Sequence, residues 1–340
     1  MSSSNQTQRI SPDLPWTVRL LLAAHVLITD ACRRSNITIN RRLLNLFDPK
    51  VSPSSKPHNG VSSFDINIDP LRHLWFRLFI PMVTSDVSSI PIIIYYHGGG
   101  FASNSPNSIA INSLARRFSR RLKAIVVSVN YRLAPEHRYP TQYDDGFGAL
   151  RFLDNVDNTN HFLPSNADLS QCFIAGDSAG GNLGHHVAVR ASEYDFKRVK
   201  IVGFMAIQPF FGGEERTESE IRFSEGPVLS LKRTDWFWKA FLPEGSDRDH
   251  PASNVFGPKA DLDISGLKFP ATLMVVGGFD PLQDRQRSYY EELKRSGKEV
   301  KMVEYPNAIH AFYAFPMLTE SSLVINDMND FMEKQLAQRG

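Results

Sequence analysis

Six continuous apolar runs, rich in β-branched and aromatic residues, constrain the fold of this 340-residue chain more than any other feature. Apolar runs that do not alternate with polar residues are typical of strands covered on both faces. Helical patterns separate several of the runs, and the alternation predicts an α/β protein with one mostly parallel sheet and helices on both sides. The runs span Ile90–Tyr96, Ala124–Val129, Cys172–Ala175, Ile201–Ile207, Ala271–Val276 and Val300–Tyr305.

Two further extended segments precede these runs. Phe64, Ile66 and Ile68 alternate with polar residues, and Leu74–Ile80 follows after a short connection. Two strands joined so tightly should pair antiparallel. The sequence therefore predicts a sheet of eight strands, with helices between the later six.

Two stretches fall outside the sheet pattern. Residues 48–63 are rich in Pro, Ser, Gly, Asn and Lys, which indicates a linker after a helical segment at about Leu14–Phe47. Residues 210–269 are rich in Trp, Phe and Glu and fit an inserted helical cap better than a sheet repeat. We predict an N-terminal helical segment with its linker at 1–60, and a core at 61–340 that carries the cap-like insertion at about 210–269.

Charge balance and cysteine count narrow the function classes. With 38 Lys+Arg against 36 Asp+Glu, no long-range field attracts a polyanion, so we expect no nucleic-acid partner. Cys32 and Cys172 are too few for a disulfide framework, which favours a reducing compartment, cytoplasmic or also nuclear. The apolar run Leu20–Ile28 is shorter than the roughly 20 residues of a membrane span, so no stable membrane insertion is expected. Monomer and homodimer both remain open.

A candidate nucleophile lies in the segment Gly176–Gly180, between the strand Cys172–Ala175 and a helix that begins at Ala179. A sharp strand-to-helix turn needs small residues around the nucleophile, and the two glycines supply that space. Such a turn raises Ser178 Oγ above the sheet and leaves the Ala179 amide at a helix N-terminus, where it can donate a hydrogen bond. Asp177 belongs to the same motif.

A second glycine-rich segment, His97–Gly100, closes the strand Ile90–Tyr96. Consecutive glycines let a backbone approach a substrate closely and turn its amides inward. We predict that the amides of Gly98 and Gly99 form an oxyanion hole with the Ala179 amide. For His97 we expect a structural role, which orients the loop, and Gly100 completes the motif.

An activated serine needs a base and an orienting carboxylate. His310, which follows the strand Val300–Tyr305 by a short loop, is the natural base. His185 and His186 lie on the helix after the nucleophile, and His250 lies in the insertion. For the acid, Asp280 directly follows the strand Ala271–Val276 through Gly277-Gly278-Phe279, whereas its competitor Asp284 lies one turn into the next helix. These residues all lie at carboxyl ends of strands, where open α/β sheets bind ligands.

Other features have simpler interpretations. Four arginines on one helix predict a solvated helix face: Arg116, Arg117, Arg120 and Arg121. No Cys/His cluster has metal spacing and no glycine loop has a nucleotide-binding pattern, so no metal or cofactor is expected. An aromatic group either lines an apolar pocket or packs in the core, and the sequence leaves both open: Phe210, Phe211, Trp236, Phe237 and Trp238.

In combination, these motifs resemble those of a plant carboxylesterase of the hormone-sensitive-lipase-like group of α/β-hydrolases, which also contains the gibberellin receptors. The resemblance covers almost the whole chain, including Thr38–Arg41, which is similar to the lid region of the family. It implies an α/β-hydrolase fold with a helical cap, an N-terminal lid and ester hydrolysis without a cofactor. It rests on His97–Phe101, Asn130–His137, Gly176–Asn182, Asp280–Leu282 and His310–Phe312.

The resemblance also implies alternatives. Gibberellin receptors keep the serine and the aspartate but replace the histidine with an aliphatic residue, and this chain has His310. Related dehydratases of isoflavonoid metabolism carry threonine as the nucleophile, and this chain has Ser178. We therefore expect a carboxylesterase that acts on a small-molecule ester. A hormone receptor with a decayed pocket and a lyase or cyclase that uses the same triad remain as alternatives.

Overall fold

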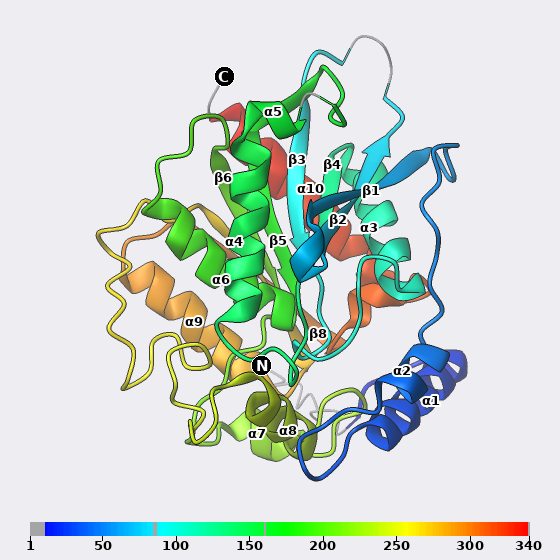
Figure 1. The fold of residues 1–340 in the computed structure, drawn as a ribbon. Coiled ribbons are helices and arrows are strands. Elements are labelled where there is room, and N and C mark those ends of the chain that lie inside the picture. Colours follow the sequence, from blue (N-terminus) through cyan, green and yellow to red (C-terminus); the bar gives the residue numbers. More distant parts are fainter. Residues whose placement is uncertain (1–10, 84–86, 160, 339–340) are drawn as a thin grey trace, which may run out of the picture.

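The computed structural model describes residues 11–83, 87–159 and 161–338, and its centre is one sheet (Figure 1). In these residues the strands follow the order β1-β2-β4-β3-β5-β6-β7-β8. Residues 1–10 of the predicted N-terminal segment and 339–340 of the predicted core lie outside the described residues. The strands are β1 (Val61–Asp69), β2 (Leu74–Pro81), β3 (Ile90–Tyr96), β4 (Ile125–Asn130), β5 (Ala167–Asp177), β6 (Ile201–Ile207), β7 (Thr272–Phe279) and β8 (Val300–Ile309).

The direction of the strands confirms the predicted fold class. β1 pairs antiparallel with β2, as the tight connection between them predicts, and β2 pairs antiparallel with β4. From β4 to β8 every neighbouring pair is parallel. The sheet is therefore eight-stranded and mostly parallel, and the carboxyl ends of the parallel strands meet at one edge.

Helices cover both faces of the sheet (Figure 1). One face packs against α4 (Thr141–Asp154), α6 (Ala179–Ser192) and α9 (Gln283–Arg295), and the other against α3 (Ile109–Leu122) and α10 (Thr319–Ala337). Along β3, Ile92 and Ile94 belong to the first hydrophobic cluster, whereas Ile93 and Tyr95 belong to the second. Burial on both sides explains why this strand is apolar throughout.

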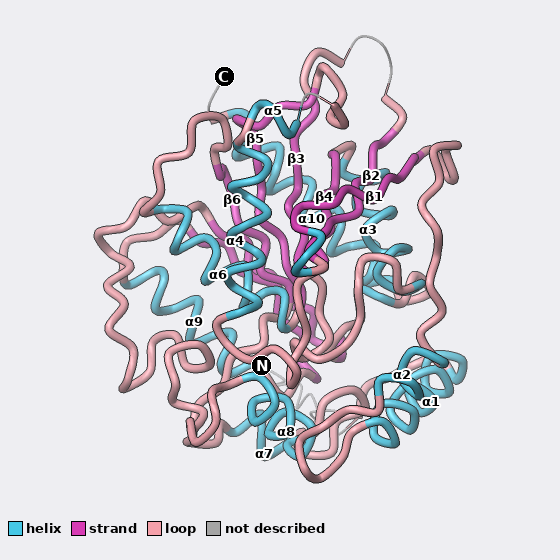
Figure 2. The backbone as a smooth tube through the Cα atoms, in the orientation of Figure 1, coloured by secondary structure: helices cyan, strands magenta, loops and turns pink. Residues whose placement is uncertain are grey.

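Four helices lie beyond the lower end of the sheet in Figure 1: α1 (Trp16–Cys32), α2 (Arg41–Leu46), α7 (Glu218–Arg222) and α8 (Leu231–Phe241). Within the predicted cap at 210–269, only α7 and α8 are α-helical, and residues 242–271 run as loop (Figure 2). The remaining short elements are α5 (Val156–Thr159) and two 3-10 turns, η1 (Pro70–Arg72) and η2 (Phe312–Ala314). No described helix combines the length and the apolar character that crossing a bilayer requires.

The N-terminal helices are tied to the rest of the chain by polar contacts. The Arg41 guanidinium donates to the Ala102 carbonyl at 2.5 Å and to the Ala134 carbonyl at 2.6 Å. The Trp236 indole Nε1 of α8 donates to the Arg34 carbonyl at 2.9 Å. The N-terminal segment is therefore anchored both to the loop after β3 and to α8.

The arginines of α3 differ from the predicted solvated face. Arg116 is buried and donates to Ser63 Oγ at 3.1 Å and to the His58 carbonyl at 3.2 Å. Arg120 and Arg121 are exposed. The prediction was wrong for Arg116, because the start of β1 and the turn before it pack against this part of α3 and supply its acceptors.

Candidate active site

Each residue of the predicted triad is the first residue after a strand. Ser178 follows β5, Asp280 follows β7 and His310 follows β8. The last residues of β7 and β8, Phe279 and Ile309, are register partners, which brings Asp280 and His310 together. Sheet topology thus gathers three segments that are far apart in the sequence.

The three side chains form a hydrogen-bonded chain. His310 Nε2 lies 2.9 Å from Ser178 Oγ, and His310 Nδ1 lies 2.8 Å from Asp280 Oδ2. Asp280 is fully buried and His310 is 4% exposed, while Ser178 keeps 8% of its surface accessible. This arrangement can transfer a proton from the hydroxyl to the imidazole while the carboxylate holds the ring.

The carboxylate of Asp280 is itself fixed. Its Oδ1 accepts from the Leu282 amide at 2.9 Å, and its Oδ2 accepts from Gln286 Nε2 at 3.0 Å. The competing Asp284 instead accepts from the Ser219 amide at 2.7 Å and pairs with Arg287. The structure therefore places Asp280, and not Asp284, against the imidazole.

The other candidate bases lie elsewhere. His185 Nδ1 lies 2.8 Å from the Tyr289 hydroxyl, and His186 stacks on Tyr143. Burial lowers the pKa of His186 to about 3, so this imidazole stays neutral. The His250 ring packs against Tyr139. Among the described histidines, His310 alone bonds to Ser178.

The turn at Ser178 is strained, as a nucleophile elbow requires. Ser178 has a left-handed φ of 52°, which non-glycine residues rarely adopt. A Cβ at Gly176 would overlap the carbonyl of Gly180, and a Cβ at Gly180 would overlap the carbonyl of Tyr96. The two glycines therefore give the space that the sequence pattern predicts.

The glycine loop after β3 differs from the prediction at one position. The Gly98 amide donates to Asp177 Oδ1 at 2.9 Å, so it is occupied and the prediction that it binds an oxyanion is wrong. In the described part of the chain, the amides of Gly99, Gly100 and Ala179 donate no hydrogen bond. These three amides are free to receive an oxyanion. Gly100, for which the sequence predicts only that it completes the motif, therefore also presents an unoccupied amide, and its place in the same glycine run is the signal for it.

Asp177 connects this loop to the rest of the site. Its carboxylate accepts from the Tyr95 hydroxyl at 2.5 Å and from the Tyr313 hydroxyl at 2.8 Å, in addition to the Gly98 amide. Burial raises the pKa of Asp177, while its three donors and the charge of His310 act in the opposite direction. Tyr313 lies three residues after His310, so one buried carboxyl links the nucleophile, the glycine loop and the histidine segment.

We predict opposite outcomes for two substitutions at Asp177. Asp177→Leu leaves the Gly98 amide and two hydroxyls without a buried acceptor, and each unsatisfied group costs about 1–3 kcal/mol. Thermal unfolding should show a large loss of stability and ester turnover should fall. Asp177→Asn keeps an acceptor for the Gly98 amide and supplies a donor to one tyrosine hydroxyl, once that hydroxyl rotates. This variant should therefore retain most of the stability and most of the ester turnover. Equal losses in the two variants would show that charge, rather than hydrogen bonding, matters at this position.

His97 lies behind the glycine loop. Its ring stacks on Tyr131 with a centroid distance of 4.4 Å, and its Nδ1 lies 2.9 Å from the Gly98 carbonyl. Burial lowers the pKa of His97 to about 4, which keeps the ring neutral. These contacts support the loop backbone and do not reach Ser178.

The aromatic residues near the site divide into two groups. Phe210 stacks on Trp238 at 4.1 Å, and both are almost fully buried, so they pack in the core. Phe211 is buried too. Phe237 is only partly buried, and a Cβ at Gly100 would overlap its ring. Of this group, Phe237 therefore lies directly against the oxyanion loop.

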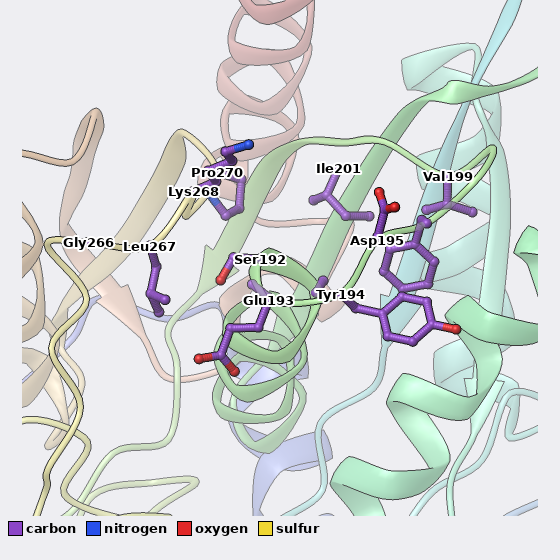
Figure 3. A pocket seen from close by; sticks show the side chains of 13 residues that line it. Ser192, Glu193, Tyr194, Asp195, Val199, Ile201, Gly266, Leu267, Lys268 and Pro270 are labelled. Carbon is purple, nitrogen blue, oxygen red and sulfur yellow. The ribbon is translucent and has the colours of Figure 1, made fainter.

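A separate surface cleft, shown in Figure 3, is lined by residues where α6 ends and β6 begins. It therefore lies at the opposite end of α6 from Ser178. It has a volume of about 440 Å³ and carries the carboxylates of Glu193 and Asp195 and the ammonium of Lys268. None of the described residues that line it is a histidine. Among the described residues, no group of three or more His, Cys, Asp and Glu could hold a metal ion.

Known proteins that are similar in sequence share the fold described above. A family model described as alpha/beta hydrolase fold matches residues 93–314. Gibberellin receptor GID1C of Arabidopsis thaliana is 40% identical, over 95% of this chain and 95% of its own. Carboxylesterase 20 of the same plant is 39% identical, over 77% of this chain and 83% of its own.

Solved structures with a similar fold include ester hydrolases. The ester-hydrolase EH1AB1 from the metagenome of Lake Arreo has a TM-score of 0.74 and 28% identity, covering 96% of this chain and all of that one. A hyperthermophilic esterase from the archaeon Pyrobaculum calidifontis has a TM-score of 0.72 and 26% identity, covering 95% of this chain and 99% of that one. The chain therefore belongs to the α/β-hydrolase family, among plant relatives that include both carboxylesterases and gibberellin receptors.

Proposed function

We propose that this α/β-hydrolase is a carboxylesterase that cleaves small carboxylic esters through an acyl-enzyme intermediate. The observation that carries the proposal is the chain from Ser178 Oγ to His310 Nε2 at 2.9 Å and from His310 Nδ1 to Asp280 Oδ2 at 2.8 Å. The esterases and carboxylesterases among the similar proteins support the same chemistry.

The reaction proceeds in two steps. Ser178 Oγ attacks the ester carbonyl carbon while His310 Nε2 takes the hydroxyl proton, and Asp280 stabilises the resulting imidazolium. The amides of Gly99, Gly100 and Ala179 bind the oxyanion. His310 then gives its proton to the departing alkoxide, which leaves as an alcohol and leaves Ser178 acylated.

Water completes the cycle. It attacks the acyl carbon as His310 Nε2 takes one of its protons, and the second tetrahedral oxyanion occupies the same amides. Collapse returns that proton to Ser178 Oγ and releases a carboxylic acid. Water is the only co-reactant that this sequence of steps needs.

A series of p-nitrophenyl esters of increasing acyl length tests the proposal. Because the triad is assembled, we expect saturable turnover of at least the short esters, measured as release of p-nitrophenol. The acyl length at which kcat/KM falls would also define the size of the acyl pocket. Turnover no faster than that of the Ser178→Ala variant across the series would refute the esterase assignment.

A second candidate, a small-ligand receptor, is favoured by the relatives and by the N-terminal segment. Three gibberellin receptors of Arabidopsis thaliana and one of rice are 37–40% identical to this chain. The Arg33 guanidinium lies 5.0 Å from the centroid of the Phe237 ring, which itself lies against the oxyanion loop. On the outer side, α1 exposes large apolar residues: Trp16, Leu20 and Leu27 are 75%, 62% and 72% exposed.

Calorimetric titration with gibberellins, run beside the ester assay, separates the two candidates. Tight saturable binding without turnover of any ester would favour the receptor. Turnover without measurable hormone binding would favour the esterase.

A further inference from the structure

A polar residue also follows the strand that lies between the strand of the nucleophile and the strands of the other two triad residues. β6 lies between β5 and β7 in the sheet, and Gln208 is the first residue after it. Four neighbouring strands are therefore each followed by a polar residue at one edge of the sheet: Ser178, Gln208, Asp280 and His310. Gln208 is fully buried and has a left-handed φ of 45°. Residues with a strained backbone cluster at active sites, where the surrounding structure holds them in place.

The Gln208 amide bonds to both peptide groups that flank His310. Its Oε1 accepts from the Ala311 amide at 2.8 Å, and its Nε2 donates to the Ile309 carbonyl at 3.2 Å. Ala311 itself has a left-handed φ of 62°, which non-glycine residues rarely adopt. One side chain thus fixes the backbone immediately before and immediately after the imidazole.

The backbone around Gln208 also fixes Ser178. The Ser178 amide donates to the Ile207 carbonyl at 2.9 Å, and the Phe210 amide donates to the Ser178 carbonyl at 2.9 Å. Two of the backbone hydrogen bonds of the nucleophile therefore come from Ile207 and Phe210, which lie just before and two residues after Gln208. The segment 207–210 is bonded to the serine through its backbone and to the histidine segment through one side chain.

The neighbouring strand is adapted to this side chain. A Cβ at Gly277 of β7 would overlap Gln208 Nε2, so an alanine at that position would push the amide away. Gly277 thus leaves room for the amide next to the strand that leads to Asp280.

We propose that Gln208 is a positioning residue, which sets the distance between His310 Nε2 and Ser178 Oγ through the backbone on both sides of the histidine. The proposal rests on the esterase function proposed above. The amide touches neither the substrate nor the reacting atoms, so its effect reaches the reaction only through the place of the imidazole. A displacement of a catalytic group by 1 Å can lower a rate about 100-fold.

Gln208→Met tests the proposal, because methionine has a similar length and volume but forms neither hydrogen bond. Gln142→Met is the matched control: Gln142 is also fully buried, and its amide donates to the His137 carbonyl at 2.5 Å, in the turn after β4. Both variants lose buried amide contacts, so both should be less stable in thermal unfolding. Only Gln208→Met should lower kcat, by about 100-fold with little change in KM.

A second readout does not depend on turnover. A histidine Nδ1 proton held by a carboxylate gives a strongly deshielded signal in proton NMR, and we expect this signal for His310 in the wild type. It should shift or disappear through exchange in Gln208→Met and persist in Gln142→Met. If Gln208→Met does not fold, Gln208→Asn, which keeps the amide but is one methylene shorter, should show the same loss of kcat.

Two results would overturn the proposal: a kcat of Gln208→Met equal to that of Gln142→Met, or an unchanged NMR signal in the folded Gln208 variant. Failure of the proposed function has a different signature. In that case the wild type itself turns over no ester, while the NMR comparison still decides whether Gln208 holds the imidazole.

Discussion

Ser178→Ala is expected to lower kcat for a short p-nitrophenyl ester by about 10⁶-fold, the loss found when a triad nucleophile is removed. The variant keeps the fold, since the backbone turn and its two contacts to the segment 207–210 do not involve the hydroxyl. Stopped-flow and steady-state release of p-nitrophenol measure the effect. The burst of an acyl-enzyme should vanish together with steady turnover.

A buried serine away from the site provides the control. Ser128 lies on β4, is fully buried, and its Oγ has no hydrogen-bond partner in the described residues. Ser128→Ala should therefore leave kcat unchanged. If Ser178→Ala retained the wild-type rate, another nucleophile would carry the reaction and the two-step mechanism would have to be abandoned.

Asp280→Asn is expected to lower kcat by about 10⁴-fold, as the loss of the orienting carboxylate does in a related triad. The contacts explain why an amide cannot replace this carboxylate. All three of its hydrogen-bond partners are in a position to donate: the Leu282 amide to Oδ1, and Gln286 Nε2 and His310 Nδ1 to Oδ2. An NH₂ group in place of Oδ2 would donate to Nδ1 and move the imidazole proton to Nε2, which then could not accept the proton of Ser178.

Asp284→Asn is the matched control for this prediction. Asp284 is the carboxyl that the sequence pattern offers as a competitor, and it accepts from the Ser219 amide and pairs with Arg287 instead of His310. Its variant should keep a kcat close to that of the wild type. Similar losses in the two variants would mean that the acid of the triad has been assigned to the wrong residue.

The strands and the convergence of the triad were predictable because their signals are local. An apolar run that is buried on both faces needs no alternation, and β3 and β6 have the bounds that their runs predict. β5 and β8 extend beyond the predicted runs, to Ala167–Asp177 and Val300–Ile309, because ladder hydrogen bonds continue through polar residues at the strand ends. The order of serine, acid and histidine along the chain then indicated Asp280 and His310 as the partners of Ser178.

Other features depend on tertiary contacts that the sequence does not encode locally. Three consecutive glycines are chemically identical, and only the orientation of the Asp177 carboxylate decides that Gly98 is occupied. Arg116 is on the expected face of α3, but the segment that buries it comes from 53 residues earlier in the sequence. Gln208 carries no charge, is not a nucleophile and belongs to no recognised motif, so nothing in the sequence marks it as part of the site.

The position of all four polar residues directly after their strands has an evolutionary consequence. Strand length and register hold the reacting groups, whereas the connections that follow, such as residues 211–271, can change in length and composition with less effect on the position of those groups. New substrates can therefore be acquired by rebuilding the connections alone. Conversely, one exchange at a strand terminus can end turnover in a protein that still folds and still binds its ligand, which makes enzymes and receptors close neighbours on this scaffold.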